Sequence, residues 1–270
     1  DEPAQPAVKS VNESDEARAI RLRSYLHLFI VCAIVLASVL LWGFYRNRER
    51  FYSLSADPKT VKRCFILLVL TGAALRLVLT LLFGGHDYDI TCWQAWGRDI
   101  VQNGTAQFYT APGHEWYDYP PGYMLVLAAV TWLLDLFRIP SGSAAAVFAY
   151  MLPAYAADVG IAILLMRFAR KRGFSESACL YLGGLAVFNP AVLVDSAAWG
   201  QIDSILTLLL LLSFSELFEG RRISAGAIYG LAIMTKWQAL IYGPVLAAEY
   251  LLSIRKKEDA LHTVGGVAAA

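Results

Sequence analysis

Residues 64–83 read CFILLVLTGAALRLVLTLLF, and Arg76 is the only charged side chain in this stretch. A helix of about 20 apolar residues crosses the hydrocarbon core of a bilayer, because only a helix satisfies its own backbone hydrogen bonds there. Other windows of this kind are joined to it mostly by short links. They cover residues 25–45, 121–137, 144–168, 177–197, 202–218 and 225–252. The sequence therefore predicts an all-α fold, a polytopic bundle of transmembrane helices.

The composition agrees with a membrane protein. Of 270 residues, 57% are hydrophobic and 17% are charged, whereas a soluble domain has about a quarter charged residues. The 23 lysines and arginines nearly balance the 22 aspartates and glutamates, which argues against a nucleic-acid partner recruited by an overall positive charge.

The positions of lysine and arginine predict the orientation of the bundle. The segment from Gly84 to Tyr119 contains only one of them, Arg98, so we expect it to form a long external loop with short amphipathic helices. The link between the apolar windows 25–45 and 64–83 is rich in basic residues and should be cytoplasmic. If the later basic clusters are cytoplasmic too, the segment that begins at Pro121 should be a re-entrant or interfacial helix. Residues 225–252 should then extend from the cytoplasmic side toward the outer face and return, with residues 236–238 near the outer tip.

Two carboxylates, Asp87 and Asp89, open the external loop in the stretch His-Asp-Tyr-Asp-Ile-Thr-Cys-Trp, residues 86–93. A carboxylate at a membrane boundary can act as a general base, because partial desolvation raises its affinity for a proton. The alternative is structural: Asp89 could cap a helix over residues 90–102, since Asp is a favoured N-cap residue.

Two more polar clusters are expected at the same membrane face. One is Asp118-Tyr119-Pro120-Pro121, where an aromatic belt and a helix start would explain the tyrosine and the prolines but not Asp118. The other is Trp199-Gly200-Gln201-Ile202-Asp203, in which Asp203 could instead be a helix cap. Asn189-Pro190 should break the helix that precedes this second cluster.

Ionisable residues also occur within or near apolar windows, where they are costly and usually functional. They are Asp158, Asp195, Lys236 and Arg76. Asp158 or Asp195 could form a structural ion pair with Arg76, and any of these residues could instead belong to a substrate site. One functional interpretation of these residues is a transporter with a pathway through Arg76, Asp158 and Lys236. Another is a flippase for a lipid-linked sugar.

Taken together, the motifs resemble those of the GT-C class of membrane glycosyltransferases, and in particular a bacterial branch similar to the second mannosyltransferase of glycosylphosphatidylinositol-anchor assembly. The resemblance runs from about Arg76 to Pro244. Four motifs in this order carry it: Asp-Ile-x-Cys-Trp-x-Ala-Trp from Asp89, Asp-Tyr-Pro-Pro-Gly-Tyr from Asp118, Ser-Ala-x-Trp-Gly-Gln-x-Asp-Ser from Ser196, and Lys-x-Gln from Lys236.

This resemblance implies an inverting transfer of a sugar, commonly mannose, from a polyprenyl-phosphate donor to an acceptor hydroxyl on the external side. It implies that Asp89 is the catalytic base, with Asp87 as the close alternative, and that Lys236 holds the leaving phosphate. The family more often has Lys-Pro-Gln. With Trp237 in place of the proline, the motif alone does not predict whether the helix breaks at this point. We expect the following residues to bind substrate: Arg76, Asp118, Tyr119, Trp199, Gln201, Asp203, Lys236 and Gln238.

We expect two parts in the chain. Residues 1–63 would comprise a polar N-terminus, an extra transmembrane helix and a cytoplasmic link, and residues 64–270 a GT-C-like catalytic module that is truncated at its C-terminus. The expected location is the bacterial plasma membrane, with the active site outside. The expected partners are the lipid-linked donor, the bilayer and a glycan, lipid or protein acceptor. His86 could bind a metal together with Asp87 and Asp89, but no H-x-x-x-H motif or carboxylate-rich calcium loop is present, so a divalent metal is possible but not indicated.

Overall fold

The computed structural model describes residues 57–110, 118–252, 254 and 257–270, together with residues 31, 34, 35, 38, 39, 42, 43, 45–47 and 49. The chain divides into two units, Asp1–Arg46 and Asn47–Ala270. In the first unit the described residues are helical and nearly all exposed, and they include Val31, Val35 and Trp42. The rest of the expected 25–45 span and the polar N-terminus lie outside the described residues.

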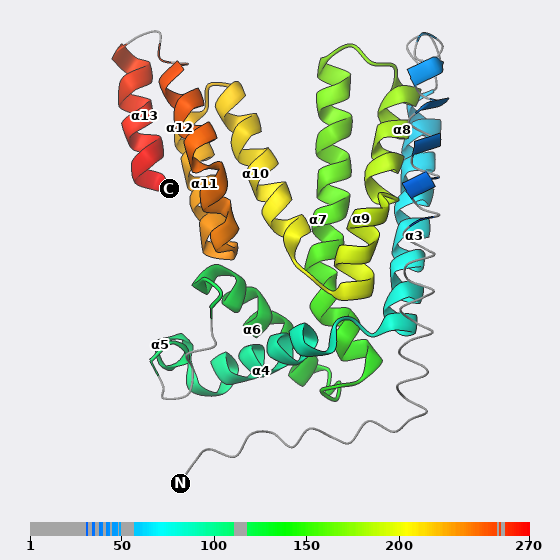
Figure 1. Ribbon diagram of the computed structural model, residues 1–270, viewed down its shortest axis with the longest axis vertical. Coiled ribbons are helices and arrows are strands. Elements are labelled where there is room, and N and C mark those ends of the chain that lie inside the picture. The colour runs from blue at the N-terminus through cyan, green and yellow to red at the C-terminus, as the bar shows by residue number, and fades with distance from the viewer. Residues whose placement is uncertain are drawn as a thin grey trace. The chain divides into compact units, whose positions relative to one another are not determined.

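In the second unit the described residues form helices and contain no strand, which confirms the predicted helical membrane bundle. Figure 1 shows the helices in their order along the chain. They are α3 (Pro58–Phe83), α4 (Asp87–Asn103), α5 (Thr105–Phe108), α6 (Pro121–Leu136), α7 (Ala144–Lys171), α8 (Glu176–Val187), α9 (Pro190–Leu193), the π-helix η1 (Val194–Trp199), α10 (Asp203–Phe218), α11 (Arg222–Thr235), the 3-10 helix η2 (Trp237–Tyr242), α12 (Gly243–Leu252) and α13 (Lys257–Ala269).

Two of the described helices, α3 and α7, are long and apolar enough to cross a bilayer alone. At about 1.5 Å per residue, the 26 residues of α3 extend about 39 Å, more than the roughly 30 Å of hydrocarbon. Leu67, Leu70 and Leu81 of α3 are more than half exposed, as expected for side chains that face lipid. The pair formed by α8 and the α9–η1 segment is bent by 40° and can serve as a third, broken span.

Helix breaks occur where the sequence predicts them. α8 ends at Val187, and the Asn189 side chain accepts a hydrogen bond from the Ala191 amide to start α9 at Pro190. The apolar window 225–252 is not one helix, because α11 ends at Thr235 and Lys236 is extended, with φ −156° and ψ 130°. The break at Lys236 therefore forms although the next residue is Trp237 and not proline.

The expected external loop is largely helical. Figure 1 shows α4, α5 and α6 at the end of the bundle where α3 finishes and where α7 and α10 begin. α4 and α6 pack closely because Gly97 has no side chain: a Cβ atom there would lie 2.9 Å from the Leu127 carbonyl oxygen. Trp93, Tyr123 and Met124 are almost completely buried between these elements.

Basic residues gather at the opposite end of the bundle, on the first turns of α3 and the last turns of α7. Carboxylates connect the helix ends there. Arg170 pairs with Glu176, Lys171 pairs with Glu219, and Arg221 pairs with Glu216. The aspartate-rich end and the arginine-rich end of the bundle are thus separated by the length of its longest helices.

Candidate active site

The site begins at the turn between α3 and α4. Gly84 and Gly85 have φ angles of 72° and 80°, which glycine adopts without strain, and they end α3. His86 is then the N-cap of α4, and its amide donates to the Trp199 carbonyl oxygen at 2.7 Å. The helix starts at Asp87, so the interpretation of Asp89 as the N-cap is wrong. Asp89 lies in the first turn of α4, where the helix dipole favours a negative charge.

The Asp89 carboxylate is held through one of its oxygens. Oδ2 accepts hydrogen bonds from Trp199 Nε1 at 2.7 Å and from Gln201 Nε2 at 2.8 Å. His86 Nδ1 lies 3.2 Å from the same oxygen, and the His86 ring stacks on the Trp199 ring at a centroid distance of 5.2 Å. Two hydrogen bonds therefore fix one oxygen, with His86 close to it, while none of the hydrogen bonds among the described residues engages Oδ1.

The local backbone of η1 brings Trp199 and Gln201 to Asp89. Gly200 has a φ of 90°, and its amide and that of Gln201 both donate to the Asp195 carbonyl oxygen at 2.9 Å. The Gly200 carbonyl oxygen in turn accepts from Trp93 Nε1 at 3.0 Å. This hydrogen bond joins the Gly200 turn directly to the Trp93 side chain of α4.

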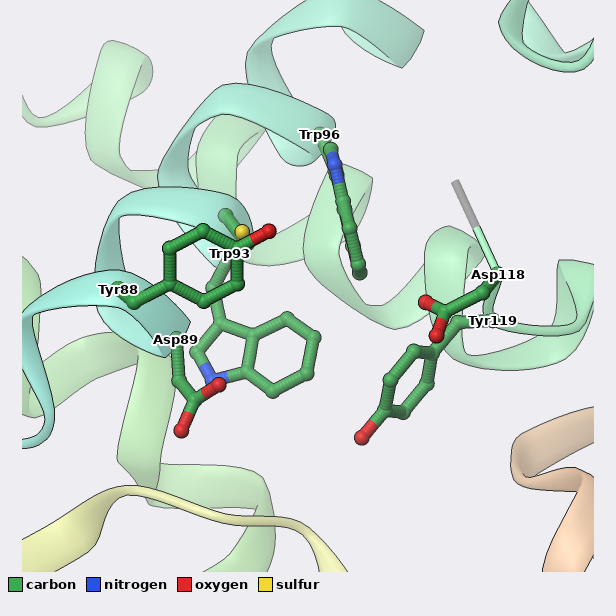
Figure 2. Close-up of a pocket in the computed structure, with 7 residues that line it drawn as sticks. Tyr88, Asp89, Trp93, Trp96, Asp118 and Tyr119 are labelled. Atoms are coloured by element: carbon green, nitrogen blue, oxygen red, sulfur yellow. The ribbon is translucent and has the colours of Figure 1, made fainter. Parts of the chain in front are cut away.

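A cavity of about 290 Å³ lies in front of the Asp89 carboxylate. Figure 2 shows Tyr88 and Asp89 on one side, Asp118 and Tyr119 on the other, and the Trp93 ring between them. Burial raises the pKa of the Cys92 thiol and of the Tyr119 hydroxyl, so both groups stay neutral near pH 7. The cavity is lined by Tyr88, Asp89, Cys92, Trp93, Trp96, Asp118 and Tyr119.

The far wall of the cavity is tied to η2. Trp237 Nε1 donates to the Asp118 carbonyl oxygen at 2.9 Å, and the Tyr109 hydroxyl donates to the Tyr119 carbonyl oxygen at 2.8 Å. The Trp237 side chain thus anchors the segment that carries Asp118.

Lys236 lies next to this wall. Its ammonium group pairs with Asp203 and is 5.8 Å from the centroid of the Tyr119 ring. The Lys236 side chain is 9% exposed and that of Asp203 is 50% exposed. Asp203 is the first residue of α10 and not its cap, which is Ile202. Tyr119 therefore connects the Asp89 cavity to the Lys236–Asp203 pair.

Not all the expected substrate-binding residues reach this place. Gln238 is exposed on η2, and Asp87 is exposed at the start of α4 and does not line the cavity. Arg76 is 3% exposed in a separate buried network. Its guanidinium donates to Asp158 at 2.9 Å and to the Val187 carbonyl oxygen at 3.0 Å. The pairing of Arg76 with Asp158 matches the structural alternative considered for these residues.

Several residues of the site were not selected from the sequence, although the pattern was present. Tyr88, Cys92 and Trp96 are four residues apart in turn, so they lie on one face of α4. Trp93 lies next to this face. Helical periodicity within residues 88–96 could have identified this cavity wall. The hydrogen bonds from Ser196 and Ser204 to Asp158 had no such signal, because nothing in the local sequence identifies their partner.

The described residues contain no group of three His, Cys, Asp or Glu side chains placed to hold a metal ion. The site itself supplies two carboxylates, aromatic walls and a buried lysine.

Comparison with known proteins identifies the family. No protein of curated function and no solved structure matches the chain. The sequence model of glycosyltransferase family 87 matches residues 116–270, which include Asp118, Trp199 and Lys236 but not Asp89. This match covers more than half of the chain. Together with its apolar helices, it shows that the chain belongs to glycosyltransferase family 87 and is an integral-membrane glycosyltransferase.

Proposed function

We propose that this protein transfers a mannose from a polyprenyl-phosphate donor to the hydroxyl group of an acceptor, with inversion of the anomeric carbon and with Asp89 as the general base. The proposed location is the external face of the bacterial plasma membrane. The donor and the sugar are proposed from the resemblance to the GT-C class and to the second mannosyltransferase of glycosylphosphatidylinositol-anchor assembly. Family 87 membership supports the coarser activity, glycosyl transfer.

One observation carries the proposed role of Asp89: two hydrogen bonds hold its Oδ2 atom, and the residue lines an aromatic cavity. A general base must present a fixed lone pair within hydrogen-bonding distance of the acceptor hydroxyl. Because Trp199 and Gln201 prevent free rotation of the carboxylate, the other oxygen, Oδ1, keeps a defined direction. Asp87 has no comparable contacts among the described residues, which favours Asp89.

The proposed reaction is a single displacement. The acceptor oxygen forms a bond to the anomeric carbon while its proton passes to Asp89 Oδ1. The bond between the anomeric carbon and the phosphate oxygen breaks, and polyprenyl phosphate leaves with the bonding electrons. Phosphate is a good leaving group, so positioning and charge stabilisation can supply most of the rate acceleration.

Lys236 is the proposed partner of the donor phosphate. Its ammonium pairs with the half-exposed Asp203 carboxylate. A donor phosphate would displace this carboxylate or share the lysine ammonium with it. Tyr119 contacts both the lysine and the cavity, so a donor held at Lys236 would place its sugar next to Tyr119 and Asp118.

The walls of the cavity are suited to a sugar. Aromatic faces and a few polar groups are the usual composition of small-molecule sites, and this cavity combines Trp93, Trp96 and Tyr119 with two carboxylates. Its volume of about 290 Å³ falls just below the range of drug-sized pockets, which suits a ligand the size of one sugar ring.

The donor assignment is tested by incubating the purified protein with polyprenyl-phosphate-mannose and a lipid extract as acceptor. We expect release of polyprenyl phosphate and a product whose anomeric configuration, measured by NMR, is opposite to that of the donor. Parallel reactions use a nucleotide-activated mannose and polyprenyl-phosphate-glucose. Turnover with the nucleotide sugar alone would contradict the proposed donor, and turnover with glucose alone would contradict the proposed sugar.

A further inference from the structure

A second cavity lies at the other end of the bundle, outside the site described above. It has a volume of about 380 Å³ and is formed by the first turns of α3, the last turns of α7 and the start of α8. Lys62 and Phe65 of α3 line it, together with Met166 and Arg170 of α7 and Glu176 of α8. The cavity thus combines two cations, one carboxylate and an apolar wall.

This cavity and the Asp89 site belong to opposite membrane faces. Phe65 and Phe83 of α3 are 18 residues apart, which corresponds to about 27 Å along the helix. That length is close to the roughly 30 Å thickness of the hydrocarbon core. If the turn after Phe83 lies at one headgroup layer, the Lys62 end of α3 therefore lies at the other.

The charges around the cavity leave Lys62 available to an anion. Arg170 and Glu176 satisfy each other through two short hydrogen bonds of 2.6 Å, so their charges nearly cancel. Lys62 is exposed and forms no ion pair with a described residue. The neighbouring surface is also basic, because Arg63 and Arg167 are exposed close by on the same two helices.

An apolar surface continues from the cation toward the membrane interior. Ile66 and Leu70 follow Lys62 at four-residue intervals, so they lie on the same face of α3. Ile66 is 46% exposed and Leu70 is 60% exposed. A ligand with its anionic group at Lys62 would therefore have a path for a hydrocarbon chain along α3, which a soluble anion does not need.

We propose that this cavity, formed by α3, α7 and α8, binds the phosphate headgroup of an anionic phospholipid from the leaflet opposite to the Asp89 site, with Lys62 as its cationic contact. The acyl chains lie along Ile66 and Leu70. The proposal does not depend on the donor or the acceptor of the transferase reaction.

Titration of the detergent-solubilised protein with short-chain phosphatidylglycerol tests this proposal, with lipid adducts counted by native mass spectrometry. Short-chain phosphatidylcholine is the zwitterionic comparison. We expect one molecule of phosphatidylglycerol to bind more tightly than phosphatidylcholine. Lys62→Gln should weaken phosphatidylglycerol binding by about fivefold or more, because a basic residue near a lipid surface contributes about 1 kcal/mol.

The matched control is Arg63→Gln, which removes the same charge from the adjacent residue, whose side chain does not line the cavity. It should weaken binding less than Lys62→Gln does, because Arg63 contributes to the surrounding basic surface and makes no contact inside the cavity. Equal losses in the two variants would show a general effect of positive charge and would overturn the site, as would an unchanged affinity in Lys62→Gln. Displacement of phosphatidylglycerol by inorganic phosphate at matched ionic strength would assign the cavity to a free anion and would also overturn the lipid proposal.

Discussion

Asp89 has an unusual set of partners at the scale of single residues. Trp199 and Gln201 are more than 100 residues away in the sequence, yet both donate to the same carboxylate oxygen. A hydrogen bond to a charged group contributes about 1.5–3 kcal/mol, so these contacts hold the carboxylate in one orientation. We infer that Trp199 and Gln201 act in catalysis by positioning Asp89 and that they need not touch the sugar.

Trp199→Phe tests this positioning role. The phenylalanine ring keeps the stack on His86 but cannot donate a hydrogen bond, so only the bond to Asp89 is lost. We expect kcat to fall by about 10- to 100-fold, because a hydrogen bond to a charge is lost, with little change in KM. Steady-state kinetics with varied donor and acceptor measure both constants.

Trp132→Phe is the control, because Trp132 is 58% exposed on α6 and does not line the cavity. It should leave both constants unchanged. A rise in KM with constant kcat in Trp199→Phe would instead mean that Trp199 binds the substrate directly.

At the scale of secondary-structure elements, one buried ion pair joins several helices. Asp158 of α7 accepts from Arg76 of α3, from Ser196 of η1 and from Ser204 of α10. Arg76 also reaches the Val187 carbonyl oxygen at the end of α8. Since η1 carries Trp199, this network fixes the element that positions Asp89.

We therefore expect Asp158→Leu to destabilise the fold by about 3–5 kcal/mol, because it leaves the Arg76 charge buried without its partner. The double variant Arg76→Met/Asp158→Leu should recover much of this loss, since an apolar pair can replace a buried ion pair. Thermal unfolding in detergent measures the midpoints. A double variant that is no more stable than the single variant would contradict the pairing.

An exposed ion pair provides the comparison. Arg98 and Asp135 pair at 2.8 Å with side chains that are 34% and 42% exposed. Asp135→Leu should therefore cost only about 0–1 kcal/mol.

The close packing of α4 against α6 leads to a second prediction at the scale of secondary-structure elements. A Cβ atom at Gly97 would meet the Leu127 backbone and Thr131 Oγ1, so Gly97→Ala must push the two helices apart. We expect a loss of about 1–3 kcal/mol, as for other overpacked contacts, and lower activity because α4 carries Asp89. Gly184→Ala is the control, because its nearest neighbour is the flexible end of Leu68. Equal unfolding midpoints in the two variants would contradict the close packing.

At the scale of the whole molecule, the sequence predicts the features that depend on local pattern. The apolar runs predict α3 and α7, Asn189-Pro190 predicts the break before α9, and the polar residues at Lys236 mark the break after α11. Local pattern does not reveal which distant residues meet. The two hydrogen-bond donors to Asp89 Oδ2, and the π-helical segment that positions them, depend on packing between α3, α4 and η1. The start of α4 at Asp87 depends on the hydrogen bond from the His86 amide to the Trp199 carbonyl oxygen.

The orientation of the molecule in the membrane follows from its two ends. Ser141 lies in the turn between α6 and α7, at the same end as Asp89, whereas Arg172 lies at the basic end of α7. With the native cysteines replaced by alanine, we expect Ser141→Cys to react with an impermeant maleimide added outside intact cells. Arg172→Cys should react only after the cells are opened. The reverse pattern would place the Asp89 site in the cytoplasm.

The central claim, that Asp89 is the base of sugar transfer, is tested most directly by the turnover of Asp89→Asn measured beside Asp87→Asn. Both variants remove one carboxylate from the first turn of α4, so their effects on folding should be alike. We predict that Asp89→Asn lowers kcat by about 10²- to 10⁴-fold, as expected for the loss of a general base, while Asp87→Asn keeps the wild-type rate. Near-normal turnover in Asp89→Asn, or a comparable loss in Asp87→Asn, would contradict the assignment.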